Sequence, residues 1–416
     1  TRMKITPEIV YLQADDEEQF PITHAGVNID KDGYLLDSWV PARYQGEFLE
    51  VPAEQIAFID LVPWQIAGTS AAVIPFLDHD EANRALMGSN MQCQAVPLLK
   101  PAAPLVGTGM ESLVVNAMNH TIRSHYDGEV VFVDGTKITI KLKSKPKLEE
   151  TDQESIKFDG NNVTYFLIKF QRTSPGSTCY SQKPMVAVGD KVKKGDLLAD
   201  GPAAEDGELA LGQNLLIAYS VFEGLGYEDA IIISDRLVRD DSLTSITIEA
   251  YEASVVETKL GPEELTRDIP NVSETDLSKL DEQGIVVIGS EVSPNDILVG
   301  KIAPKGETEL TAEEKLLRAI FSEKAREVRD TSLRMPHGER GIVIDVSILD
   351  REKGDELESG TNKKIIAKVA QIRKVMVGDK LAGRHGNKGV ISKIVSAADM
   401  PYLPDATPVD IIISSL

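Results

Sequence analysis

"DGEVVFVDGTKITIKL" (residues 127–142) places two runs of apolar and β-branched residues on either side of Asp134-Gly135. An Asp-Gly pair between two such runs is a strong short-range signal for a β-hairpin. The chain continues in the same way. NVTYFLIKFQRT (162–173) predicts another strand, and VAVGDKVKKGDLLADGP (186–202) repeats an apolar–Gly–Asp unit typical of tight turns in a β-barrel or sandwich. We therefore expect a mostly β fold with some α.

Composition limits the class of protein. The chain has 416 residues, 42% of them hydrophobic, and a formal net charge of −22. That length exceeds one ordinary core, so two or three domains are expected. No apolar run reaches the roughly 18 residues of a membrane span. Two cysteines, Cys93 and Cys179, cannot form a disulfide framework, and His79, His120 and His125 lack metal-ligand spacing. A reducing, cytoplasmic compartment is the expectation.

Both ends of the sequence lie within structured-looking stretches. The chain starts at Thr1 without a methionine, and it stops after the strand-like PVDIIISSL (408–416). We expect it to be a piece of a longer polypeptide.

A basic stretch interrupts the acidic chain. Residues 361–393 contain nine Lys or Arg and one acidic residue, Asp379. Such a stripe suits a protein that holds a polyanion at one surface and repels it elsewhere. Within it, GDKLAGRHGNKGVISKI (378–394) combines four glycines with cations, and its spacing does not match a P-loop. A turn gripping phosphates and a solvated surface turn are both compatible with it. The donors would be Lys380, Arg384, His385 and Lys388.

Adjacent carboxylates stand between two apolar strands at GYEDAI (226–231). Glu228 and Asp229 could hold Mg²⁺ directly or through water, since Mg²⁺ takes few carboxylates and keeps waters. Two solvated acids on a turn are the alternative.

Polar side chains crowd the helix predicted in DEANRALMGSNMQCQAV (80–96), where Ala82, Leu86 and Met87 can share an apolar face. Arg84 could clamp a phosphate, and the amides could bind sugars or base edges. A capped surface helix is the alternative. The polar residues are Asn83, Arg84, Asn90, Gln92 and Gln94.

The segment 243–375 differs in character from its flanks and is predicted to be a domain inserted into a larger β-rich one. It is acidic and holds hairpin-like strands around one helical stretch, TAEEKLLRAIFSEKAREVRD (311–330). Thr311 and Glu314 form a capping-box pattern at its start. An apolar stripe at helical spacing favours either packing on its own domain or docking of a partner. The stripe consists of Leu316, Leu317, Ile320 and Phe321.

Several of these motifs together resemble one family. DHDEANRALMGSNMQ, PLVGTGME, GDLLADGP, GELALGQN, GYEDAIIIS, TKLGPEE, PKGETELTAEEKLLRAIFSEKA and GDKLAGRHGNKGVISKI occur in this order over nearly the whole chain. The chain resembles the β-subunit family of bacterial DNA-directed RNA polymerases; plastid polymerases share the pattern.

The resemblance implies an α+β architecture with a double-psi β-barrel core, a barrel-sandwich hybrid element and an inserted flap domain. The expected divisions are a β-rich external segment at 1–70, the first part of the hybrid-binding core at 71–242, the flap at 243–375 with a tip helix at 311–325, and the second part of the core at 376–416.

The resemblance also assigns residues. Lys380 and Lys388 match lysines that contact the RNA 3′ region and the nucleotide phosphates, Glu228 and Asp229 match an acidic pair near a second Mg²⁺, and Arg84 matches an arginine reaching the triphosphate. Cys93 stands where the family has a basic residue. Further nucleic-acid contacts are expected at Asn83, Asn90, Gln94, Arg384, His385, Asn387 and Lys393. The flap stripe Leu316, Leu317, Ile320 and Phe321 is expected to bind sigma.

The expected activity is template-directed nucleotidyl transfer, active only in a complex. The implied partners are the β′, α and sigma subunits, the DNA template, the RNA transcript and the nucleoside triphosphate, with no membrane. The implied cofactor is Mg²⁺: the catalytic ion is held by β′, and a second ion arrives with the nucleotide.

A carrier or binding module is the alternative function. GDKVKKGDLLADG resembles the turn-rich barrel of biotinyl and lipoyl carriers, and Lys183 in SQKPM would be the modified lysine. The Met-Lys-Met setting of such carriers is missing there.

Overall fold

The computed structural model describes residues 3–414 apart from 63–64, 66, 119, 144–155, 174–175, 260 and 305–327. Strands dominate and the helices are short, which confirms a mostly β fold with some α. None of the helices in these ranges is long and apolar enough to cross a membrane. The predicted tip helix at 311–325, with its stripe of Leu316, Leu317, Ile320 and Phe321, lies outside the described residues.

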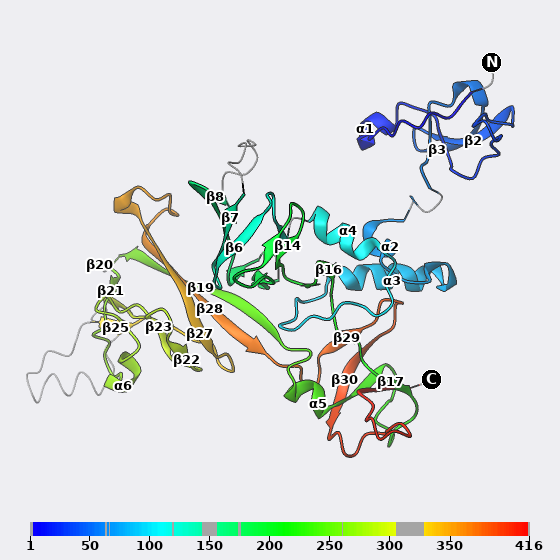
Figure 1. The fold of residues 1–416 in the computed structure, drawn as a ribbon. Helices are drawn as coiled ribbons and strands as arrows, with labels where there is room; N and C mark the ends of the chain where they lie inside the picture. Colours follow the sequence, from blue (N-terminus) through cyan, green and yellow to red (C-terminus); the bar gives the residue numbers. More distant parts are fainter. Residues whose placement is uncertain are drawn as a thin grey trace, which may run out of the picture.

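The N-terminal part is a small four-stranded sheet in the order β3-β2-β1-β4, set apart from the rest of the chain in Figure 1. Its core contains Ile22, Val40 and Ala42. The elements are α1 (Ala14–Glu17), β1 (Ile22–Thr23), β2 (Trp39–Tyr44), β3 (Glu47–Pro52), η1 (Ala53–Gln55) and β4 (Phe58–Ile59).

Four helical elements follow, and two of them bear on the candidate site described below. They are α2 (Thr69–Ala72), η3 (Leu77–His79), α3 (Ala82–Cys93) and α4 (Met110–Ala117).

The hairpin predicted at 127–142 is present as β6 (Gly128–Val133) and β7 (Lys137–Leu142), two antiparallel strands. Asp134 closes the turn by accepting a hydrogen bond from Thr136 N at 2.6 Å. The sheet continues in the order β13-β6-β7-β9-β8, and a second sheet has the order β12-β14-β5. The remaining strands are β5 (Ile122–Arg123), β8 (Ile156–Asp159), β9 (Asn162–Phe166), β10 (Gln171–Arg172), β11 (Cys179–Tyr180), β12 (Lys183–Pro184), β13 (Lys191–Val192), β14 (Leu197–Asp200), β15 (Ala204–Glu205) and β16 (Glu208–Leu209).

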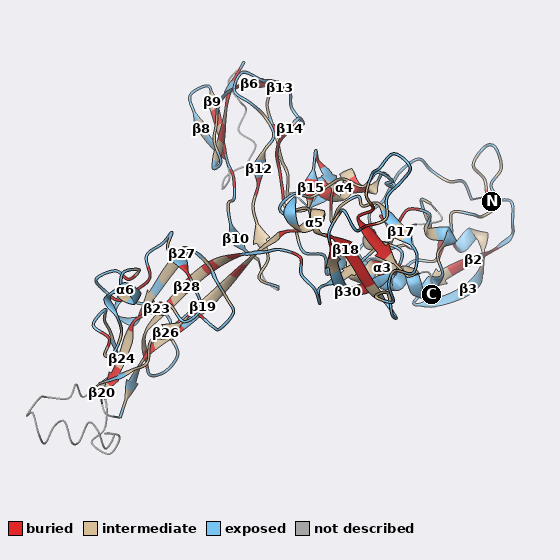
Figure 2. Cartoon of the chain, turned by 90° about the horizontal axis from the view of Figure 1, so that it is seen from below, coloured by how far each residue is buried: buried red, intermediate tan, exposed pale blue. Residues whose placement is uncertain are grey.

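A mixed five-stranded sheet, β17-β31-β18-β30-β29, joins segments on both sides of 243–375. β18 is its most buried strand, because Ile231, Ile232 and Ile233 are all shielded from solvent (Figure 2). β18 runs parallel to β30 and antiparallel to β31. The elements are β17 (Ile217–Tyr219), β18 (Ala230–Ser234), α5 (Asp235–Arg239), β29 (Lys380–Ala382), β30 (Lys388–Val395) and β31 (Ile411–Ile413).

A long twisted arm leaves this sheet, as both Figure 1 and Figure 2 show. Its main sheet has the order β20-β19-β28-β27-β22. Burial alternates along β28, so that Ile365, Ala367 and Val369 face the arm's core as a period-2 strand requires. The elements are β19 (Ser245–Thr258), β20 (Gly261–Pro262), β21 (Glu264–Leu265), α6 (Glu274–Leu277), β22 (Glu291–Val292), β23 (Ile297–Val299), β24 (Lys301–Pro304), β25 (Val328–Asp330), β26 (Leu333–Arg334), β27 (Gly341–Asp350), η5 (Arg351–Lys353) and β28 (Thr361–Arg373).

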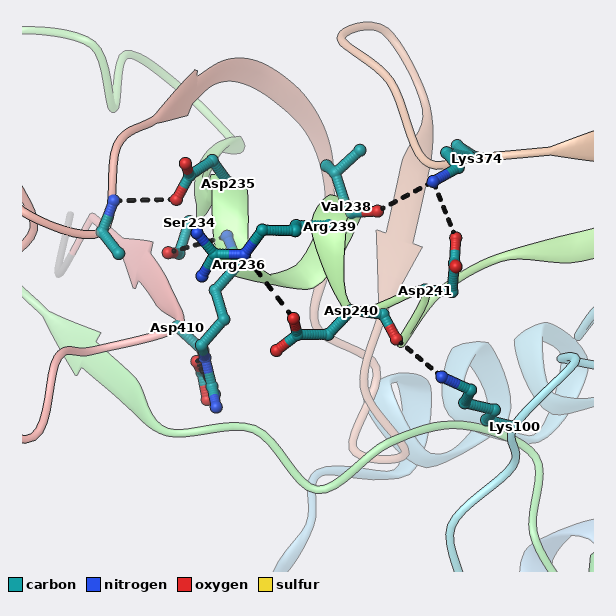
Figure 3. A network of polar contacts seen from close by, with 11 residues as sticks. Lys100, Ser234, Asp235, Arg236, Val238, Arg239, Asp240, Asp241, Lys374 and Asp410 are labelled. Atoms are coloured by element: carbon teal, nitrogen blue, oxygen red, sulfur yellow. Dashed lines mark hydrogen bonds and ion pairs between the residues drawn. The ribbon is translucent and has the colours of Figure 1, made fainter.

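Polar contacts around α5 join the arm to the mixed sheet (Figure 3). Lys374, just after β28, forms an ion pair with Asp241 at 2.9 Å. Lys100 donates to the carbonyl oxygen of Asp240 at 3.1 Å. Arg236 pairs with Asp410, whose side chain is only 5% exposed. The base of the arm is thus held from several directions. The barrel topology and the division points at 70, 242 and 375 stay predictions.

The core of the arm yields the first prediction. Ile365→Ala should lower the free energy of unfolding of the arm by about 2–5 kcal/mol, because the fully buried side chain leaves a cavity. Hydrogen exchange of the β27 and β28 amides in the full-length subunit would measure it. Ile372→Ala in the same strand is the control, since that side chain is 65% exposed and should change stability by about 0.5 kcal/mol or less. Equal effects would contradict the assigned core.

Candidate functional site

The glycine-rich turn is a tight hairpin between β29 and β30. Gly383 N donates to Asn387 O at 2.9 Å, and a β-carbon on Gly383 would lie only 2.4 Å from Asn387 Oδ1. Lys380 lies opposite Val390, and Ala382 lies opposite Lys388. Lys380 and Ala382 are two residues apart on β29, so they share one face of the hairpin. Lys388 lies opposite Ala382 and therefore projects from that same face. Both lysines are exposed.

Helix α3 supports this turn through backbone contact. A β-carbon on Gly88 would lie 2.1 Å from Arg384 O, and one on Gly386 would lie 2.4 Å from Arg84 O. Gly386 also has a φ of +84°, which side chains rarely adopt. Arg84 Nη1 donates to Gly386 O at 3.3 Å. Only glycine at both positions allows the helix and the turn to approach this closely.

The apolar side chains that share a face of α3 do not form its buried side. Leu86 is 62% exposed and Met87 is 38% exposed, whereas Gly88 is the buried residue of the helix. The helix packs through its backbone at a glycine, so the rule that apolar side chains mark the buried face does not apply here.

The turn is also tied to two segments about 300 residues earlier in the chain. His385 Nδ1 lies 2.7 Å from Asp80 Oδ2. Arg384 Nη1 donates to Val106 O at 2.9 Å. The side chains of Arg384 and His385 are therefore engaged within the chain itself.

The backbone of the acidic pair contacts the strand that follows Lys388. Val390 N donates to Asp229 O at 3.2 Å, and a β-carbon on Gly389 would lie 2.2 Å from that same oxygen. Glu228 has a φ of +53°, which turns the chain into β18, and both side chains are exposed. Two accessible carboxylates fit the preference of Mg²⁺ for one or two protein carboxylates, with waters or phosphates completing the shell. No group of three or more metal-ligating side chains occurs in the described ranges.

The basic stripe divides into two parts with different roles. On the arm its lysines form ion pairs: Lys364 with Glu252 at 2.6 Å and Lys368 with Asp345 at 2.8 Å. Lys363 pairs with Asp350 at 3.2 Å, and Lys374 pairs with Asp241. Arg373 donates to Thr247 and Gln371. Across the described residues no hydrogen bond or ion pair engages the side chain of Lys380, Lys388 or Lys393, so the outward-facing cations gather at β29 and β30.

The other predicted residues are spread along α3. Asn83 Nδ2 donates to Glu81 Oε1 at 2.5 Å, and Glu81 also caps the helix, so Asn83 takes part in the helix start. Asn90, in the second half of α3, and Gln94, the residue that follows the helix, are both exposed. Cys93 is a free, exposed thiol 3.4 Å from Ser70 Oγ.

Comparison with known proteins identifies the family of the chain. The family description "RNA polymerase Rpb2, domain 6" matches residues 123–416, and "RNA polymerase beta subunit external 1 domain" matches residues 1–61. The chain belongs to the β-subunit family of DNA-directed RNA polymerases. It is similar to the DNA-directed RNA polymerase subunit beta of Acetivibrio thermocellus, with 53% identity over 413 residues, which is 99% of this chain and 32% of the relative. The same subunit of Caldicellulosiruptor bescii is 52% identical over the same shares. The chain thus spans about a third of the length of these relatives.

The carrier alternative loses its support. The polymerase family accounts for nearly the whole chain, whereas the carrier pattern covers one short stretch. Lys183 lies within the two-residue strand β12, paired opposite Asp200, and not on the exposed hairpin turn where a carrier presents its modified lysine.

Two carboxylates that contact the site escaped the sequence analysis. Asp80 contacts His385, and Glu111 closes the loop to which Arg384 binds. Glu111 ends the PLVGTGME motif, one of the motifs that carry the family resemblance. An acidic residue two positions after the Gly107-Thr108-Gly109 run is the sequence signal that could have found it.

The contact between α3 and the turn predicts that a substitution that favours an isolated helix will destabilise this protein. Alanine has a higher helix propensity than glycine by about 1 kcal/mol, so Gly88→Ala would stabilise a free helix. Here the added β-carbon meets Arg384 O, so we expect a destabilisation of about 1–3 kcal/mol. Faster hydrogen exchange of residues 383–388 in the full-length subunit would report it. Ser89→Ala, at the next position, is the control and should leave that exchange unchanged. A more stable turn in Gly88→Ala would refute the contact.

Proposed function

We propose that this chain is the portion of an RNA polymerase β subunit that binds the transcript end and the incoming nucleoside triphosphate. The observation that carries the proposal is the pair of Lys380 and Lys388. They project from one face of a hairpin fixed by α3, and the strand that carries Lys388 contacts the backbone of Asp229 through Gly389 and Val390. Family membership supports the same reading.

The chemistry proposed for the lysines is electrostatic. Phosphoryl transfer spreads negative charge over the equatorial oxygens, and fixed cations stabilise that charge without reorganising. The glycine contacts with α3 hold the hairpin in place, so little entropy is lost when it binds phosphates. Arg84 keeps one guanidinium nitrogen on Gly386 O and can direct its others toward a triphosphate. Arg384, His385 and Asn387 then shape the turn, while Lys393 extends the cationic surface along β30.

Magnesium is the proposed cofactor, and it neutralises phosphate charge when bound. Glu228 and Asp229 would help to hold the ion that accompanies the nucleotide, directly or through water. A further catalytic ion would be held by the β′ subunit. The residues of this chain would orient and neutralise the phosphates.

The proposed partners are the β′, α and sigma subunits, the DNA template and the RNA transcript. Asn90 on α3 and Gln94 just after it are exposed and are the proposed contacts to the RNA–DNA hybrid, with Asn83 at the start of that helix. Docking of sigma at 311–325 rests on the sequence alone, through the apolar stripe of Leu316, Leu317, Ile320 and Phe321.

The lysines supply the central test. In the assembled polymerase, Lys380→Ala or Lys388→Ala should slow nucleotide addition roughly tenfold or more, because a hydrogen bond to a charged group contributes about 1.5–3 kcal/mol. Single-nucleotide addition on a preformed RNA–DNA scaffold measures it. Lys364→Ala is the matched control, since that lysine belongs to the same basic stretch but pairs with Glu252 on the arm. Normal rates in both test variants would reject the proposal.

The metal role of the acidic pair has a separate signature. Asp229→Asn keeps the size of the side chain and removes its charge, so the loss of addition rate should be larger at low Mg²⁺ than at saturating Mg²⁺. A titration of Mg²⁺ in the addition assay measures this. Asp399→Asn, an exposed carboxylate after β30, should show the wild-type dependence. An unchanged Mg²⁺ dependence in Asp229→Asn would leave the pair as solvated turn residues.

A further inference from the structure

A buried carboxylate outside the predicted site closes the loop before α4. Glu111 is only 5% exposed. It accepts hydrogen bonds from Thr108 N at 2.9 Å and from Gly109 N at 2.8 Å. A β-carbon on Gly107 would lie 3.0 Å from Glu111 Oε1, so the loop wraps tightly around the carboxylate. The conformation of residues 107–109 therefore depends on this side chain.

The loop closed by Glu111 carries the anchor of the cationic turn. Val106, one residue before Gly107, accepts the 2.9 Å hydrogen bond from Arg384 Nη1. Arg384 is two residues from Gly386 and four from Lys388 along the chain. A continuous path thus runs from Glu111 through the loop backbone to Arg384 and on to Lys388.

Electrostatics act along the same path. Burial works to raise the pKa of Glu111, but hydrogen bonds from the backbone of Thr108 and Gly109 and the positive charge of Arg384 together hold that pKa below its usual range. Burial lowers the pKa of Arg384, and the charge of Glu111 opposes that shift. Each charge thus favours the ionised form of the other.

We infer that Glu111 is a positioning residue for the cationic turn: it fixes the 106–109 loop, and through Arg384 it sets the placement of Lys388. The inference rests on the proposed function for its consequence in nucleotide addition. Glu111 itself touches no substrate. Its effect is confined to the geometry of the hairpin that carries the lysines.

The test uses the complete polymerase containing the full-length subunit, with single-nucleotide addition on a preformed RNA–DNA scaffold. Glu111→Gln keeps the shape and one carbonyl acceptor but removes the charge. We expect the maximum rate to fall about three- to tenfold with KM changed less than about twofold, because a small misplacement of a catalytic group slows the reaction without loss of binding. Asp350→Asn is the control: that carboxylate is also 5% exposed and closes its own turn, but at the far end of the arm.

Coupling to Lys388 separates positioning from general stability. If Glu111 acts through Lys388, adding Glu111→Gln to the Lys388→Ala variant should lower the maximum rate of nucleotide addition by less than about twofold further. The inference would be overturned if Glu111→Gln lowered the rate by the same factor in the wild-type and Lys388→Ala backgrounds, or if it had no effect at all. If Glu111→Gln does not assemble, Arg384→Gln cuts the same path at its other end and must show the same coupling.

Hydrogen exchange of residues 383–388 distinguishes a failed inference from a failed proposed function. Glu111→Gln should speed this exchange, and Asp350→Asn should not. If Lys388→Ala leaves nucleotide addition unchanged, the proposed function is wrong. The exchange measurement alone then tests whether Glu111 positions the turn. Unchanged exchange of residues 383–388 in Glu111→Gln would overturn that inference.

Discussion

The tightest packing in the site is the contact between the backbones of α3 and the β29–β30 turn at Gly88 and Gly386. Each glycine faces a carbonyl oxygen at a distance that no β-carbon tolerates. Gly389 meets Asp229 O in the same way on the opposite side of the turn. Three segments far apart in the sequence therefore meet at glycines, and the space left allows one arrangement. The direction in which Lys380 and Lys388 project follows from that arrangement and not from contacts of their own.

Strand pairing determines which lysines of the basic stretch are neutralised by a carboxylate. On the arm, neighbouring strands place Glu252 and Asp345 against the lysines of β28. Exposed pairs of this kind contribute little stability, about 0–1 kcal/mol each, but they cancel the field of the cations. On β29 and β30, by contrast, no hydrogen bond or ion pair within the described residues engages the side chains of Lys380, Lys388 and Lys393. The field at this hairpin is thus positive although the chain as a whole is acidic, which favours the approach of a polyanion there.

Features set by local sequence could be predicted, and features set by distant contacts could not. The hairpin at 127–142 follows from its Asp-Gly turn, and α3 follows from its spacing. The buried side of α3 was missed because a glycine backbone makes the contact. The partners of Arg384 and His385 lie 278 and 305 residues away, and no pattern near the turn points to them. The roles of the lysines came from the family resemblance, since a cationic glycine turn alone is equally typical of a solvated loop.

The hydrogen bond from Arg84 to Gly386 spans 302 residues, and this separation has a consequence for biosynthesis. A ribosome adds about 5–20 residues per second, so Gly386 is synthesised roughly 15–60 s after the Arg84 of α3 that it contacts. The strand β18, the most buried of its sheet, likewise emerges long before β30. During that interval the nascent chain exposes an apolar strand and an unpaired helix face. The arm, whose strands pair largely with one another, can fold first and bring β30 back to the waiting strand.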